Sequence, residues 1–328
     1  MKLLNSSLFM KVLASSAMWT SLSIATLPLA AGADPLPERD VKPAPHVAAP
    51  YTLPWQLRSI MAANVARLDS AVAFYSDKNG NTGGLSVASV FTGAYKLIPD
   101  LAILTRVGMV KNAPPESASG ATSFLNPLLG VLYSRSLSSE FRIGLFLGFT
   151  VPVGSGGGNT PDLSVQASHS AGVLARSAMD NALFVTNYLA VIPGLDLAYI
   201  SNGLTVQMEA TLLQLTRVRG EQIDKDTSRT NFTSGVAVGY SFAPLVSVMG
   251  ELRYQRWLSN ATVSAAASPA IDNLSFAIGP RFNAQIGTTT FKPGIAYAQG
   301  LSGPMANGNY TYPTHSDRVI FIDVPVAF

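Results

Sequence analysis

Residues 140–153 read EFRIGLFLGFTVPV and decide the fold. Large apolar side chains occupy every second position from Phe141 onward, while Arg142, Gly144 and Thr150 lie between them. Successive side chains of a β-strand point to opposite faces, so this period of two predicts a strand with one apolar face. The other face carries small residues and a single arginine, which is unlike the Lys- and Glu-rich surface of a soluble sheet.

The same alternation recurs from residue 60 to the end of the chain. It predicts strands at 60–75, 83–97, 101–111, 125–137, 140–153, 183–200, 203–219, 230–243, 245–258, 272–286, 290–301 and 317–328. Short turns alternate with longer connections at 76–82, 112–124, 154–181, 220–230, 259–271 and 302–316. Outer-membrane barrels have short periplasmic turns and longer outer loops. We therefore predict an all-β fold, an antiparallel up-and-down transmembrane β-barrel of about 12 strands over residues 59–328, located in the outer membrane.

One part of this prediction has an alternative. Pro193-Gly194 interrupts the strand expected at 183–200, and Ala167–Ala178 also fits a helix within the longest loop.

The composition supports a membrane barrel. Charged residues make up 12% of the chain and apolar residues 48%, whereas a soluble domain has roughly 25% charged residues. After residue 33 no stretch has the length and apolar character of a transmembrane helix. The chain has no cysteine, which excludes a thiol site. Without Lys2 and Lys11, 20 of the 22 basic side chains remain against 19 acidic ones, so we expect no nucleic-acid partner. No metal or cofactor is expected either.

The N-terminal region predicts export. Lys2 and Lys11 precede an apolar stretch that ends in Ala31-Gly32-Ala33, which fits a signal peptide over residues 1–33. A retained inner-membrane anchor is the alternative. Residues 34–58 are rich in proline and predict an extended periplasmic tail.

The last strand alternates up to a terminal aromatic residue. Ile320, Ile322, Val324 and Val326 precede Phe328 in this pattern. It resembles the C-terminal signature of outer-membrane barrels, so Phe328 is the expected signal for the barrel assembly machinery. Outer-membrane lipid is the other expected partner, and the oligomeric state stays open.

If the apolar faces point to lipid, a set of charged residues lines the lumen. The set is Arg67, Asp69, Arg106, Arg142, Glu209, Arg217, Arg219, Glu251, Arg253, Arg281, Lys292 and Asp323. Two interpretations follow, and they can coexist. The charges can form a salt-bridged network that props or plugs the barrel, or they can line a narrow pore with mild anion preference. Twelve strands lie between filled and open barrels, so a narrow or gated passage is expected.

Two short stretches carry a family resemblance. They are Asn126-Pro127-Leu128-Leu129-Gly130 and residues 146–154, which read FLGFTVPVG. They resemble the outer-membrane barrels known as transporters of the meta-pathway of phenol degradation. The resemblance implies passage of small hydrophobic or aromatic molecules, with loop 154–181 as a gate at the mouth.

Three functions remain open. The first is a channel that passes small solutes of a hydrophobic, aromatic or anionic kind. The second is a structural or adhesive surface protein with a plugged barrel. The third is a hydrolase at the rim, in which His169 or His315 would work with Asp162, Asp180 or Asp317. Catalysis on the barrel wall needs a histidine there, and no predicted strand supplies one, so we expect no enzyme.

Overall fold

The computed structural model describes residues 51–76, 81–115, 119–159, 162–176, 179–220, 227–259, 271–302 and 318–328. The predicted signal peptide and residues 34–50 of the predicted tail lie outside these residues. The same holds for His315, Asp317 and most of the predicted loops 259–271 and 302–316.

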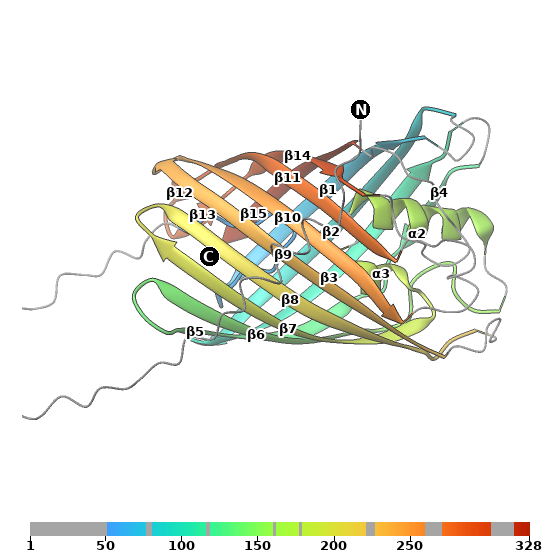
Figure 1. The fold of residues 1–328 in the computed structure, drawn as a ribbon, viewed down its shortest axis with the longest axis horizontal. Helices are drawn as coiled ribbons and strands as arrows, with labels where there is room; N and C mark the ends of the chain where they lie inside the picture. Colours follow the sequence, from blue (N-terminus) through green and yellow to red (C-terminus); the bar gives the residue numbers. More distant parts are fainter. Residues whose placement is uncertain are drawn as a thin grey trace, which may run out of the picture. The chain divides into compact units, whose positions relative to one another are not determined.

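The described chain forms a closed antiparallel barrel of twelve strands, as predicted (Figure 1). The strands are β1 (Val65–Tyr75), β2 (Gly84–Ile98), β3 (Leu101–Ala113), β5 (Leu128–Ser136), β6 (Phe141–Thr150), β7 (Tyr188–Ser201), β8 (Leu204–Arg217), β9 (Ser228–Ala243), β10 (Val246–Ser259), β11 (Asp272–Phe282), β14 (Gly294–Gly300) and β15 (Arg318–Ala327). β1 and β15 close the barrel, in a register that runs from Val65 opposite Ala327 to Phe74 opposite Arg318. Because the wall is closed, it has no long unpaired strand edge. A sheet that spans a membrane must be closed in this way.

The alternation of side chains distinguishes the outer face of the wall from the face that lines the lumen. On β6, Leu145, Leu147 and Phe149 are exposed, whereas Phe146 and Thr150 are buried in the interior. The same division runs through the other long strands, so the outer surface is a belt of large apolar side chains. Such a surface is suited to lipid rather than to water.

Turns and loops separate the two ends of the barrel. Short turns join β2 to β3, β5 to β6, β7 to β8 and β9 to β10, and we call this the short-turn end. The turn between β7 and β8 contains Asn202-Gly203, both with positive φ, as a tight two-residue hairpin requires. We call the opposite end, with the longer connections, the long-loop end.

Three short strands extend the barrel at its rims. β4 (Ala121–Phe124) pairs with the end of β3 at the long-loop end. β12 (Ala284–Ile286) and β13 (Thr289–Phe291) form a small hairpin between β11 and β14, and β13 also pairs with β15.

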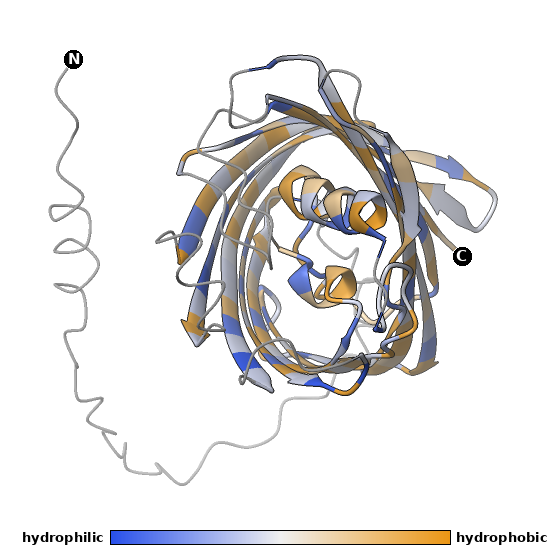
Figure 2. Ribbon diagram, turned by 90° about the vertical axis from the view of Figure 1, so that its right-hand side faces the viewer, coloured by the Kyte–Doolittle hydropathy of each residue, from blue (hydrophilic) through white to orange (hydrophobic). Residues whose placement is uncertain are grey.

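The longest loop folds into the barrel. α2 (Leu163–Ala175) begins at Asp162, whose carboxylate accepts the backbone N–H groups of Ser164 and Val165. α3 (Asn181–Phe184) follows. Figure 2 shows both helices inside the ring of strands. Residues 183–187 were therefore wrongly predicted as strand, while the alternative of a helix in this loop agrees with α2.

The N-terminal border of the barrel also differs from the prediction. β1 begins at Val65, so the predicted strand over residues 60–64 is wrong. Residues 51–60, which we call the interior segment, lie inside the barrel and contact the wall. The predicted periplasmic tail therefore cannot extend to residue 58. The partners that hold this segment lie far away in the sequence, and period-two alternation gives no sign of them.

Candidate functional site

The interior segment pairs with no strand, so its backbone groups need side-chain partners. The wall supplies them. The backbone N–H of Trp55 donates to Glu251 at 2.7 Å, and that of Gln56 donates to both oxygens of the same carboxylate at 3.1 and 3.2 Å. The N–H of Arg58 donates to Glu209 at 2.6 Å. Two carboxylates of the wall thus bind three N–H groups of the segment.

Two arginines bind the carbonyl groups. Arg281 donates to the carbonyl oxygens of Leu53 at 2.6 Å and Pro54 at 3.0 Å. Arg67 donates to the carbonyls of Pro54, at 3.2 Å, and Trp55. The Arg281 guanidinium also lies over the Trp55 ring, 4.0 Å from its centroid. Both polar edges of the segment are therefore bound by charged groups, which form stronger hydrogen bonds than neutral ones.

Glycines on the inner wall make room for the segment. A Cβ atom at Gly235 would lie 2.5 Å from Leu57, and one at Gly294 would lie 2.7 Å from Trp55. Neither distance is possible between real atoms without movement. The small residues on the polar faces of the sequence thus form a groove that fits the interior segment.

A second set of charges holds the loop at the long-loop end. Arg176, which ends α2, forms ion pairs with Asp69 of β1 and with Asp180. Asp180 also pairs with Arg106 of β3 at 2.6 Å. Burial alone would raise the pKa of Asp180, but the Arg106 and Arg176 charges outweigh it and hold the pKa well below its usual range. Asp180 is therefore a carboxylate at neutral pH.

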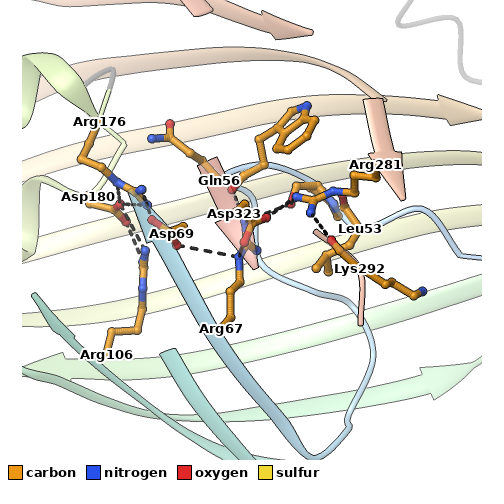
Figure 3. A network of polar contacts seen from close by, with 12 residues as sticks. Leu53, Gln56, Arg67, Asp69, Arg106, Arg176, Asp180, Arg281, Lys292 and Asp323 are labelled. Atoms are coloured by element: carbon orange, nitrogen blue, oxygen red, sulfur yellow. Dashed lines mark hydrogen bonds and ion pairs between the residues drawn. The ribbon is translucent and has the colours of Figure 1, made fainter. Parts of the chain in front are cut away.

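The two sets join into one row of alternating charges (Figure 3). In order, the row consists of Arg106, Asp180, Arg176, Asp69, Arg67, Asp323 and Arg281. It links the α2–α3 loop, the barrel wall and the interior segment.

A cavity of about 320 Å³ lies in the lumen. The interior segment bounds it on one side and residues 179–183 bound it on another. Its wall is mainly aliphatic and aromatic, with Leu104, Leu128, Leu132, Phe146, Leu183, Ile192 and Leu213 among the lining residues. Most of the charged groups on it are engaged with one another, whereas Lys292 donates to the backbone carbonyl of Tyr51. Arg106 pairs with Asp180, and Arg58 pairs with Asp196 at 3.4 Å and with Glu209 at 3.2 Å.

The structure places most of the predicted lumen residues in the interior. Those buried on the inner face are Arg67, Asp69, Glu209, Glu251, Arg253, Arg281 and Asp323. Arg106 is half-buried in the cavity wall. Arg142 lies near the short-turn end and donates to Ser134 and Ser136. Arg217 ends β8 at the long-loop end, and Arg219 follows it, donating to the carbonyl of Gly154. Lys292 donates to the carbonyl of Tyr51.

Sequence reasoning missed several charged residues of the lumen, among them Asp196, Arg58 and Arg176. Asp196 is fully buried on the inner face of β7, and its position in the alternation could have identified it. Arg58 and Arg176 lie in segments without alternation, so the sequence held no comparable signal for them. Phe328 follows β15, and its N–H donates to Asn64 at 3.2 Å. Its role in assembly remains a prediction.

The residues of the hydrolase hypothesis that the structure describes give it no support. His169 lies on α2, with Nε2 2.9 Å from the carbonyl oxygen of Ser155. Asp162 caps α2, and Asp180 is bound by two arginines. Among the described residues, no group of three His, Asp or Glu side chains could hold a metal ion. No helix in the described ranges is long and apolar enough to cross a membrane.

The closed wall and its apolar exterior define the class: this is a transmembrane β-barrel of the outer-membrane type. An outer-membrane channel from Pseudomonas putida F1 has a similar structure, with a TM-score of 0.54 and 12% identity, over 87% of this chain and 99% of that one. The KdgM porin in complex with oligogalacturonate is a looser match, with a TM-score of 0.45 and 9% identity, over 80% of this chain and 99% of the porin. No protein-family model and no curated relative matches the sequence. At these identities the similarity is one of fold.

Proposed function

We propose that this protein is an outer-membrane channel that passes small, neutral, largely apolar solutes through a gated lumen. The observation that carries the proposal is the apolar cavity enclosed by the barrel wall, the interior segment and residues 179–183. Burial of apolar surface contributes roughly 25 cal/mol per Å², so such a cavity favours an apolar occupant.

The ion pairs of the cavity arginines favour neutral solutes over anions. The arginines that face the cavity already bind carboxylates, as Arg106 does with Asp180 and Arg58 with Asp196. An anionic solute would have to displace an acidic side chain to reach a guanidinium. Of the solute classes predicted from the sequence, the hydrophobic one therefore fits the cavity better. The resemblance to phenol-pathway transporters points in the same direction.

Transport requires movement on both sides of the cavity. The interior segment and the α2–α3 loop occupy the lumen, and ion pairs and hydrogen bonds hold both of them. We infer that the channel is closed in this conformation and that a minor open state carries the solute.

A pair of substitutions on one strand tests the proposal. Leu132 lines the cavity, whereas Leu129 on the same strand faces lipid. Cells with the protein in their outer membrane should take up a radiolabelled neutral aromatic alcohol faster than cells without it. Leu132→Trp fills the cavity and should abolish this gain, while Leu129→Trp should retain it. Equal uptake by the two folded variants would contradict transport through the cavity.

The alternative is a structural or adhesive surface protein with a plugged barrel. The observation in its favour is the buried row of charges, which joins the lumen's contents to the wall. If the folded wild-type protein gives no gain in uptake of neutral or anionic solutes, this alternative replaces the channel.

The two ends of the chain direct the protein to the outer membrane. We propose that residues 1–33 direct export and are removed, that residues 34–50 lie in the periplasm, and that Phe328 is presented to the assembly machinery. Deletion of Phe328 should lower the amount of heat-modifiable folded barrel in the outer membrane.

A further inference from the structure

Arg253 is a buried charge of the lumen with unused hydrogen-bond donors. It lies on the inner face of β10 and is only 1% exposed. Its Nη1 donates to Oε1 of Gln56, and its Nε lies 3.5 Å from Glu251. Neither Nε nor Nη2 has a hydrogen-bond partner among the described residues. A buried guanidinium has five N–H donors, and leaving them unused is costly.

The groups next to Arg253 add further donors. Nε2 of Gln56 and Oγ of Ser275 also have no partner within the described part of the chain. Both residues are more than nine-tenths buried. Ser275 lies directly opposite Arg253 in the register of β10 and β11, and Gln56 is already bonded to it. Figure 3 shows Gln56 beside the row of charges. Three side chains thus offer donors at one place.

The balance of charge at this place is positive. The row of alternating charges contains four arginines and three aspartates. Arg253 and Glu251 add one charge of each sign, so these nine groups together keep one positive charge. The Glu251 carboxylate is itself occupied by the N–H groups of Trp55 and Gln56. An unpaired charge of this kind is expensive in a buried site.

An excess of negative charge elsewhere in the lumen does not offset this positive charge. Arg58 faces two carboxylates, Asp196 and Glu209. The charged groups that act on Arg253 are instead Glu251, Arg176 and Asp180. On the remaining side the guanidinium faces the Phe321 ring, 5.3 Å from its centroid, which supplies no counter-charge.

We propose that Arg253, Gln56 and Ser275 bind one small monovalent anion of the size of chloride. The anion accepts hydrogen bonds from Nε and Nη2 of Arg253, Nε2 of Gln56 and the Ser275 hydroxyl. It neutralises the excess positive charge and holds Gln56, and with it the interior segment, against β10. Arg253 and Ser275 do not line the apolar cavity, which the site meets only at Gln56, and the proposal does not depend on the transported solute.

Bromide locates the site directly. Crystals of the full-length mature protein would be grown without halide, soaked in sodium bromide and measured at the bromine absorption edge. The expected result is an anomalous peak in contact with Arg253, Gln56 and Ser275. A crystal with bromide peaks only at the protein surface would overturn the proposal.

Stability in solution provides a second test. At constant ionic strength, replacing gluconate with chloride should raise the Tm of the purified barrel, because an ion that binds only the folded state stabilises it. Arg253→Met should abolish this chloride dependence, and Arg142→Met, a matched change outside the charge row, should retain it. Equal chloride dependence in both variants would contradict the proposal.

If Arg253→Met does not fold, Arg253→Lys keeps the charge with fewer donors and should shift the midpoint of the chloride titration to higher concentration. An unchanged midpoint in that variant would contradict the site.

Discussion

The backbone N–H of Trp55 donates to Oε2 of Glu251 at 2.7 Å, across 196 positions of sequence. This bond and its neighbours at Gln56 attach the interior segment to β10. The segment has no sheet partner, so its place in the lumen depends on such side-chain contacts.

We predict that Glu251→Gln loosens the interior segment. The amide keeps one acceptor oxygen but loses the charge that binds two N–H groups and lies beside Arg253. The free energy of unfolding should fall by about 1–3 kcal/mol, and single-channel recordings should show more frequent openings. Glu140→Gln is the matched control, because Glu140 lies at the short-turn end and accepts from Ser201. Identical recordings from the two variants would argue against Glu251 as an anchor.

A disulfide should lock the segment in place. The chain has no cysteine, and a Cβ atom at Gly239 would lie 2.8 Å from Cβ of Thr52. Disulfides span about 3.8 Å between Cβ atoms, so a small shift permits the bond in a Thr52→Cys, Gly239→Cys double variant. If the segment moves during transport, the oxidised form should be inactive and a reductant should restore uptake. Full uptake by the oxidised form would show that the segment stays in place.

Filling the groove should expel the segment while the barrel remains. Gly235→Val places a side chain where Leu57 lies, and overpacking of this kind costs about 1–3 kcal/mol. Trp55 fluorescence should shift to longer wavelength and proteolysis before residue 60 should accelerate. Gly250→Val is the control, because a Cβ atom at Gly250 on the neighbouring strand β10 would meet only the Val238 carbonyl oxygen, at 3.9 Å. Equal protection of the segment from proteolysis in the two variants would show that Gly235→Val does not expel it.

Docking of α2 should weaken in acid. Burial lowers the pKa of His169 below its usual value, although the bond to the Ser155 carbonyl partly opposes this. The unfolded chain then takes up the proton first, so stability is full above about pH 6.5 and falls as the pH drops toward the lowered pKa. Thermal unfolding at pH 7.5 and 5.5 measures the effect. His169→Gln can still donate to Ser155 and should lose this part of the pH dependence. If the wild-type protein and the variant show the same pH dependence of stability, groups other than His169 cause it.

Much of the wall could be predicted from the sequence. Alternation in stretches such as 140–153 gave the strands, their apolar face and the closed count of twelve, because a side-chain period of two is a local property of an extended backbone. It also gave the inner position of residues such as Arg281 and Asp323. The predicted borders were wrong before Val65 and at 183–187, although neither stretch contains proline or glycine, whereas Pro193-Gly194 lies within β7.

What fills the barrel was decided only by the tertiary structure. Residues 51–60 carry no periodic signal, and their partners Glu251 and Arg281 lie about 200 positions away. Arg176 finds Asp69 across 107 positions. The sequence alone determined a lipid-facing wall with a charged interior, because alternation is encoded residue by residue. The sequence alone did not decide whether those charges would face water, one another or an inserted segment. Closure of the wall decided it, because closure brings distant strands together around the lumen. A polar backbone segment can enter that space only when its N–H and carbonyl groups are hydrogen-bonded.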